Sequence, residues 1–191
     1  MATEIELKAW VNDPKQVKDI IETFAEPLGS YVKEDSYWLP LADISSDPRE
    51  QKRGSLGSGV RIRQENGQVL VTLKRKEVQE GVEINDELEF SVSSASDFES
   101  FLQFLGFAPW IRKHKEGEAW RWQNITIELS LVQNLGWFAE LEILAESPDP
   151  QTLEHARKSL LNCLEKIGIP ETNIESRYYT ELLLERGITQ R

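Results

Sequence analysis

The sequence contains little of the chemistry that cysteine and histidine supply. Cys163 is the only cysteine among 191 residues, so no disulfide can form within the chain, as is typical of a reducing compartment. Besides Cys163 the chain has only two histidines, His114 and His155, which are too few for a conventional zinc site.

Long apolar runs are also missing. No N-terminal stretch resembles a signal peptide, and no segment approaches the roughly 20 consecutive apolar residues that a membrane span needs. We therefore expect a cytoplasmic protein with no membrane partner.

Positive charge is scarce, since 22 Lys and Arg face 33 Asp and Glu and the net charge is −11. Such a chain is poorly suited to binding nucleic acid or an anionic membrane. A small anionic ligand is still compatible with this balance, because a local cluster of Lys and Arg can lie inside an acidic protein. The length and the 39% hydrophobic content suit a single globular domain, which we expect to cover residues 1–191.

The spacing of apolar residues predicts an α+β protein dominated by antiparallel strands. Helices are predicted from Pro14 to near Pro27, at 96–105 and at 150–167, with a short helix or closing segment at 176–186. A closed or nearly closed sheet would bury such strands without exposed edges. The strands are predicted at 3–11, 31–41, 59–65, 68–77, 84–92, 107–116, 118–123, 124–132 and 136–146.

One side of these strands carries charge in strand after strand, because alternate residues face opposite sides of a sheet. A solvated face explains any one charged pair, but so many strands in succession favour the lining of a tunnel. The intervening residues are mostly apolar and would pack under helices. The polar positions are Glu4, Glu6, Lys8, Lys33, Asp35, Tyr37, Arg61, Arg63, Thr72, Lys74, Lys76, Glu87, Glu89, Lys113, Lys115, Glu128, Ser130, Glu140 and Glu142.

The grouping of acids and bases indicates the chemistry of the ligand. Carboxylates with no thiol or imidazole nearby suit hard cations such as Mg²⁺ or Mn²⁺. Lys and Arg suit phosphate oxygens, Arg through its two-pronged guanidinium and Lys as a point charge. Together they predict a small-molecule substrate whose polyphosphate oxygens bridge to the metal.

The same residues resemble the CYTH superfamily, also called triphosphate tunnel metalloenzymes. Glu4-Ile5-Glu6-Leu7-Lys8 resembles its ExExK signature, and the later matches follow the family order along nearly the whole chain. These are Asp35-Ser36-Tyr37-Trp38 (D-x-Y-F), Val60-Arg61-Ile62-Arg63 (L-R-I-R), Leu73-Lys74 (L-T-x-K), Glu87-Leu88-Glu89 (the acidic strand), Lys113-His114-Lys115 (K-x-R), residues 135–142 (L-G-x-F-x-E-x-E), and Arg177-Tyr178 with Leu182-Leu183 (S-Y-x-x-L-L).

The resemblance implies an eight-stranded antiparallel tunnel, that is, a closed barrel with helices packed outside, together with a triphosphate substrate and dependence on Mg²⁺ or Mn²⁺. It is also compatible with a homodimer. The residues carried over as metal ligands are Glu4, Glu6, Glu140 and Glu142. The substrate-binding candidates are Lys8, Lys33, Arg61, Arg63, Lys74, Lys76, Lys113, Lys115 and Arg177. The catalytic candidates are Lys8, Glu87, Glu89 and Glu128.

The sequence departs from the family pattern at three positions. Ser130 stands where the family often has an acid, and Glu128, on the same face, is our candidate substitute. Lys115 stands where Arg is common, which removes the two-pronged geometry. Arg177 separates a Ser and a Tyr that are adjacent in the family, which leaves the register of the tail open.

Three functions are compatible with this pattern. A phosphohydrolase acting on tripolyphosphate, thiamine triphosphate or a nucleoside triphosphate is favoured, because the histidine-containing segment that we associate with class IV adenylyl cyclases is not found before Glu4. The alternative is such a cyclase, which converts ATP to cyclic AMP and pyrophosphate, since the L-G-x-F strand is similar to that branch. A non-catalytic polyphosphate-binding module is the third, although it would have less need of the carboxylates.

Two further features have open roles. Trp38 and Trp120 are considered as platforms that stack an organic ring of the substrate. Residues 42–58 are considered as either a lid or a plain loop.

Overall fold

The computed structural model describes residues 3–44, 59–79, 82–145 and 149–189, with only the backbone of residues 74–79, 86 and 87. The strands are β1 (Thr3–Trp10), β2 (Glu26–Pro40), β3 (Val60–Glu65), β4 (Gln68–Gln79), β5 (Val82–Val92), β6 (Phe107–Trp122), β7 (Ile125–Val132) and β8 (Gly136–Ala145). The helices are α1 (Pro14–Ile21), α2 (Ala95–Phe104), α3 (Pro150–Lys166) and α4 (Tyr179–Glu185), with 3-10 turns η1 (Leu41–Asp43) and η3 (Glu171–Asn173). The predicted α+β class is confirmed.

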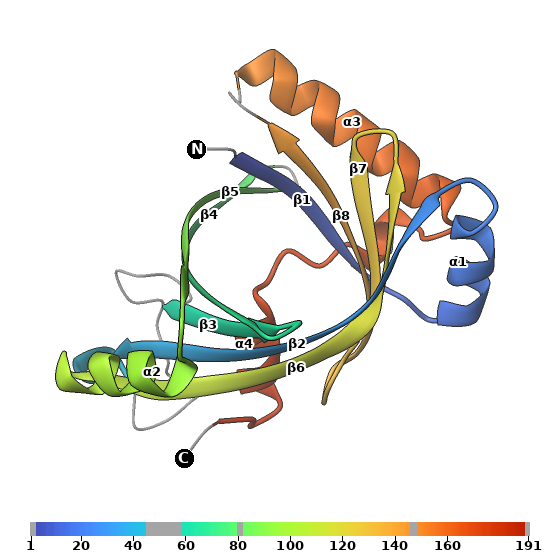
Figure 1. The fold of residues 1–191 in the computed structure, drawn as a ribbon. Coiled ribbons are helices and arrows are strands. Elements are labelled where there is room, and N and C mark those ends of the chain that lie inside the picture. The colour runs from blue at the N-terminus through green and yellow to red at the C-terminus, as the bar shows by residue number, and fades with distance from the viewer. Residues whose placement is uncertain (1–2, 45–58, 80–81, 146–148, 190–191) are drawn as a thin grey trace.

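The strands form one strongly curved antiparallel sheet around a hollow (Figure 1). In the order β1-β5-β4-β3-β2-β6-β7-β8 each strand pairs with its neighbours, and β8 pairs back with β1. The two seams beside β1 differ in length. The ladder with β8 runs from Thr3 to Trp10, whereas the ladder with β5 covers only Thr3 to Glu6.

Two apolar clusters lie on the outer face of the sheet, beneath helices. In the first, outward residues of β1, β7 and β8, such as Ile5 and Leu141, pack with Leu160 and Cys163 of α3 and with α1. Burying an aliphatic side chain of this kind contributes about 1.5–3 kcal/mol. Cys163 is part of this core, and burial raises the pKa of its thiol to about 12. The second cluster places Leu102 of α2 against Trp38 and Ile62.

The helices begin where the sequence supplies a cap. Asp13 accepts a hydrogen bond from the backbone N–H of Gln16 (3.0 Å), and Pro14 fits the first turn of α1. Asp149 does the same for α3 through the N–H of Thr152 (2.9 Å). None of the helices in the described ranges is long and apolar enough to cross a membrane.

The C-terminal helix α4 does not follow the prediction that the helices pack outside. Its buried Tyr179, Leu182 and Leu183 belong to a third cluster with Phe138 and Ile111. By strand alternation, Phe138 shares the inner face of β8 with Glu140, and Ile111 shares the inner face of β6 with Lys113. The expectation is therefore wrong for α4, which fills one end of the hollow because most of its side chains are apolar and buried.

Two other boundaries differ from the sequence prediction. β2 begins at Glu26, not at 31, and α1 ends at Ile21, because Pro27 and Gly29 lie in an irregular part of the β2–β6 ladder and do not terminate a helix. Most of the segment weighed as a lid or a loop, residues 45–58, lies outside the described residues.

Strand β6 is continuous, although the sequence predicted two strands at 107–116 and 118–123. Gly117, which suggested a break, lies opposite both Tyr31 and Ser130. A Cβ atom on Gly117 would lie 2.3 Å from the backbone oxygen of Leu129. This glycine therefore marks a close approach between strands and not a turn.

Replacing Gly117 by alanine is therefore expected to lower the free energy of unfolding by about 1–3 kcal/mol, the usual cost of overpacking. Urea denaturation of the purified protein measures this change. Glu116→Ala, at the exposed neighbouring position, is the control and should stay within about 0.5 kcal/mol of the parent. Equal stability of the two variants would contradict the close approach.

Candidate functional site

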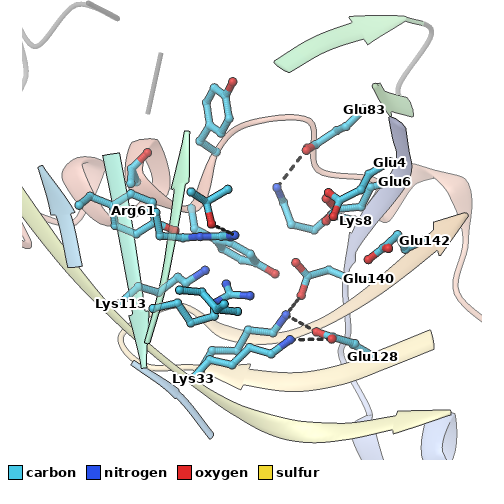
Figure 2. Close-up of a pocket in the computed structure, with 18 of the residues that line it drawn as sticks. Glu4, Glu6, Lys8, Lys33, Arg61, Glu83, Lys113, Glu128, Glu140 and Glu142 are labelled. Atoms are coloured by element: carbon cyan, nitrogen blue, oxygen red, sulfur yellow. Dashed lines mark hydrogen bonds and ion pairs between the residues drawn. The ribbon is translucent and has the colours of Figure 1, made fainter. Parts of the chain in front are cut away.

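A cavity of about 280 Å³ lies inside the curved sheet, and every described strand contributes side chains to it (Figure 2). Many of the polar residues that share a face by strand alternation line this cavity, whereas Asp35 and Ser130 do not. The lining residues from the strands are Glu4, Glu6, Lys8, Lys33, Tyr37, Arg61, Arg63, Leu70, Thr72, Glu83, Glu89, Lys113, Lys115, Thr126, Glu128, Glu140 and Glu142. Gly59 and, from the tail, Tyr178, Tyr179 and Thr180 complete it.

The strand order separates the charges into two walls. The adjacent strands β3, β2 and β6 form the basic wall, which carries Arg61, Arg63, Lys33, Lys113 and Lys115. The adjacent strands β7, β8, β1 and β5 form the acidic wall, which carries Glu128, Glu140, Glu142, Glu4, Glu6, Glu83 and Glu89, together with Lys8. A ligand in the cavity would therefore meet cations on one side and carboxylates on the other.

Asp35 is the anion that holds two cations of the basic wall in place. Its carboxylate lies 2.7 and 2.9 Å from the Nε and Nη2 atoms of Arg63, and 2.9 Å from Nζ of Lys113. The side chain of Asp35 is 0% exposed. Burial opposes ionisation, but Arg63 and Lys113 together hold the pKa of Asp35 well below its usual range. Asp35 thus fixes the direction of both cations without lining the cavity itself.

Glu128 accepts hydrogen bonds from three groups. Lys33 Nζ, Lys115 Nζ and the hydroxyl of Tyr31 lie 2.7, 2.7 and 2.8 Å from its oxygens. Lys115 also contacts Glu140. Despite its burial, the two ammonium groups lower the pKa of Glu128. With these contacts Glu128 is the counter-ion of the two lysines. It can accept a proton only after both lysines bind another anion.

Lys8 belongs to β1, in the acidic wall, and its side chain reaches the tail. Its Nζ lies 3.3 Å from Glu83 and donates to the backbone oxygen of Arg177 at 2.7 Å. The Nζ atoms of Lys8 and Lys113 each lie 4.7 Å from the centroid of the Tyr179 ring, so that this ring contacts cations from both walls. Burial and the carboxylates of Glu140 and Glu6 raise the pKa of the Tyr179 hydroxyl, which stays protonated at neutral pH.

Arg61 and Glu89 meet through Thr72. Arg61 Nη2 lies 3.0 Å from the Thr72 hydroxyl, which donates to Glu89 at 2.9 Å, and the Arg61–Glu89 separation is 3.7 Å. The Glu89 side chain is 40% exposed, so this network lies toward an open part of the cavity. Every cation of the basic wall thus has a carboxylate within 4.0 Å.

The acidic wall brings like charges into register. Glu6 lies directly opposite Glu83 on β5 and Glu142 on β8, so three carboxylates form a row on one face. Like charges in directly opposite positions are destabilising unless a cation compensates them. Oxygen ligands of this kind fit Mg²⁺ or Mn²⁺. Among the side chains that the structure describes, however, no three His, Cys, Asp or Glu residues are already gathered closely enough to hold a metal ion.

Several sequence-predicted residues have a different place. Arg177 does not line the cavity, because its guanidinium binds Glu175 (2.6 Å) and Glu185 (2.8 Å), which corrects its expected place beside the substrate. Trp38 and Trp120 pack in the outer clusters, which corrects the idea that they stack a ring of the substrate. The side chains of Lys74, Lys76 and Glu87 lie outside the described part of the structure.

Sequence reasoning missed four contributors to the site. Glu83 was lost because the predicted strand began at 84, although it shares the face of Glu89. Tyr31 and Thr126 share a strand face with the charged residues, but they were omitted because they carry no charge. Tyr179 was missed because the tail was aligned on Tyr178. The available signal was that Tyr179 stands three residues before Leu182-Leu183, in the pattern Y-x-x-L-L.

Comparisons with known proteins bear on the family and on the fold. The family model described as the CYTH domain matches residues 2–179. A protein of Methanocaldococcus jannaschii named as a putative adenylate cyclase is 25% identical over 182 residues, covering 94% of this chain and 97% of that protein. The solved structure of the PH1819 protein from Pyrococcus horikoshii OT3 is 27% identical with a TM-score of 0.77, covering 96% of this chain and 99% of the other.

A further solved structure shows the fold alone, because its sequence is only 20% identical. It is a putative adenylyl cyclase from Hippeastrum described as having a dominant triphosphatase activity, with a TM-score of 0.68 over 98% of this chain and 97% of the other.

Proposed function

The chain belongs to the CYTH domain family, and from this premise we propose that it is a divalent-metal-dependent phosphohydrolase acting on a small triphosphate. The observation that carries the proposal is the division of one cavity into a basic and an acidic wall. A chain of phosphates needs cations along one side, and the metal that neutralises it needs carboxylates along the other. In this proposal the hollow is the tunnel that the family resemblance implied.

The ion pairs of the cavity support a mechanism of exchange. Glu128 holds Lys33 and Lys115 in the absence of ligand, as Asp35 holds Arg63 and Lys113. Phosphate oxygens would replace Glu128 and Glu140 as partners of the lysines. These two carboxylates would then turn toward the other members of the acidic wall. Asp35, which is buried between these two cations, would stay in place and keep both of them aimed inward.

The residues present fit a hard cation by their donor chemistry. Glu4, Glu6, Glu140 and Glu142 are the proposed ligands, and all are carboxylates on adjacent strands. Because no complete cluster is preformed among the described side chains, the phosphate oxygens would supply the remaining ligands, as Mg²⁺ sites commonly require. When bound, such an ion supplies charge neutralisation and a more acidic water.

The other side chains would bind and orient the substrate. Arg61, Arg63, Lys33, Lys113 and Lys115 are proposed to hold phosphates, with Lys8 approaching from the acidic wall. Lys74, Lys76 and Glu87 are retained as proposals of the family resemblance. Glu89, which already accepts from Thr72, is the proposed acceptor that orients the attacking water.

Cyclisation of ATP is the second candidate, since a relative is named as a putative adenylate cyclase. That reaction requires a site for adenine and a ribose hydroxyl directed at the α-phosphorus. Trp38 and Trp120, which were considered as platforms for such a ring, both lie outside the cavity. The described lining of the cavity is dominated by charged side chains. Hydrolysis requires only bound phosphates and a positioned water, so it needs no site for adenine or ribose.

Ligand-dependent melting and product analysis test the proposal together. Tripolyphosphate with Mg²⁺ or Mn²⁺ is expected to raise the melting temperature, because the ligand binds only the folded state; a hundredfold excess over its dissociation constant stabilises by about 2.7 kcal/mol. Orthophosphate release from tripolyphosphate, thiamine triphosphate or ATP would identify a hydrolase. Cyclic AMP with pyrophosphate would identify a cyclase, and a melting shift with no turnover would indicate a binding module. The proposal fails if no triphosphate shifts the melting curve.

A further inference from the structure

Asn85 is a buried polar residue of the inner face that the proposed site does not yet use. The residue is 0% exposed, and neither its Nδ2 nor its Oδ1 atom has a hydrogen-bond partner among the side chains and backbone that the structure describes. Most buried amide groups in folded proteins are hydrogen-bonded, so a carboxamide with both ends unsatisfied requires an explanation. A carboxamide needs donors and an acceptor at once, which an apolar neighbour cannot supply.

The register of β5 places Asn85 next to the acidic wall. It is directly opposite Glu4 on β1, and it lies two residues from Glu83 on the same face of β5. Both of these carboxylates line the cavity, and directly opposite residues of a ladder share one face of the sheet. A ligand held by Glu4 and the basic wall would therefore lie within the neighbourhood of the Asn85 side chain.

We propose that Asn85 is a substrate-positioning residue whose carboxamide is satisfied only by the metal–triphosphate complex. Its Nδ2–H would donate to a phosphate oxygen, and its Oδ1 would face the cation side of the complex as an oxygen ligand or a hydrogen-bond acceptor. The inference rests on the proposed function, which supplies the ligand. The unsatisfied amide destabilises the ligand-free protein, and the complex recovers this energy as affinity.

Two substitutions separate the roles of the nitrogen and the oxygen. Asn85→Leu has a similar size and removes both polar atoms, whereas Asn85→Asp keeps the oxygen and loses the donor. Ser130→Ala is the control, because the Ser130 hydroxyl is also buried and has no hydrogen-bond partner among the described residues. Ser130 is not among the residues that line the cavity, and it lies opposite Phe138 of the apolar cluster around α4.

Melting without ligand is the first measurement. In EDTA, Asn85→Leu and Ser130→Ala are both expected to melt at the parental temperature or about 2–4 °C above it, since each removes an unsatisfied buried group. A clear decrease for Asn85→Leu beyond that of the control would mean that the amide already has a structural partner, and would overturn the inference.

Titration calorimetry with MnCl₂ alone, and with tripolyphosphate plus MnCl₂, is the second measurement. Asn85→Leu is expected to weaken tripolyphosphate binding about 10- to 100-fold, as for a hydrogen bond to a charged group, while Ser130→Ala leaves it unchanged. Asn85→Asp should retain Mn²⁺ binding and lose tripolyphosphate affinity. Parental affinity in both Asn85 variants would overturn only this inference, whereas a parent protein that binds no tripolyphosphate would reject the proposed function and this inference with it.

Discussion

Replacing Asp35 by alanine is expected to lower the free energy of unfolding by about 3–5 kcal/mol, the usual cost of leaving a buried charge without its partner. The reason is that Asp35 is the shared counter-ion of Arg63 and Lys113, whose side chains are 14% and 4% exposed. Without it, two cations of the basic wall lie in a low-dielectric interior with no anion between them. Chemical denaturation measures the change.

Two further variants separate charge from volume in this prediction. Asp35→Asn keeps the shape of the side chain and is expected to lose most of the same stability, whereas Glu34→Ala, on the exposed side of β2, should change it by less than about 1 kcal/mol. Adding Lys113→Met to Asp35→Asn should recover part of the loss, because one uncompensated cation is removed. If Asp35→Asn is as stable as the parent, the carboxylate is not the anchor of the wall.

The Asp35 carboxylate also predicts how the free energy of unfolding depends on pH. Because the pKa of Asp35 is lower in the folded protein than in the unfolded chain, its contribution is fully present above the unfolded value of about 3.9. The contribution is lost as the pH falls from there toward the folded pKa. Between pH 5 and pH 2 the parent should therefore lose stability more steeply than Asp35→Asn, which no longer carries the titrating group.

Much of this arrangement follows from the sequence because a strand has only two faces. The spacing of Glu4, Glu6 and Lys8 already determines that they share a side, and repetition of the pattern in later strands makes a shared interior the economical explanation. The sequence does not say which acid meets which base. Asp35 and Glu128 look alike by spacing, yet the structure pairs them with different cations. Asp35 pairs with Arg63 and Lys113, whereas Glu128 pairs with Lys33 and Lys115.

The errors have physical causes as well. Two strands were predicted on either side of Gly117 because a glycine inside a strand pattern can mark either a break or a close approach of two strands. Only the position of the neighbouring backbone of Leu129 distinguishes the two. Helix α4 was placed outside because packing of a short apolar helix into the end of a curved sheet depends on contacts between distant segments. The same long-range packing brings Tyr179 over Lys8, a pair separated by most of the chain.

The second large effect is expected at Glu6, where replacement by glutamine should lower kcat by about 10²- to 10³-fold, comparable to removing one preorganised electrostatic group from an active site. Glu6 is the middle member of the carboxylate row that includes Glu83 and Glu142. Glutamine keeps the size of the side chain but not its charge. Steady-state kinetics at several Mn²⁺ concentrations would measure the loss, and Glu22→Gln, at the exposed residue that follows α1, is the control.

The binding of the anion should respond in the opposite direction. Without metal, tripolyphosphate binds the cavity against the repulsion of the acidic wall, so removing one of its charges should leave this affinity equal or tighter. With metal, the Glu6→Gln variant should need more Mn²⁺ to reach its own maximal rate. This combination distinguishes a lost metal ligand from a damaged fold, which would weaken anion binding as well. Full turnover in Glu6→Gln would show that the row is only a set of counter-ions for Lys8 and its neighbours, and the proposed division of the cavity into a phosphate wall and a metal wall would then be wrong.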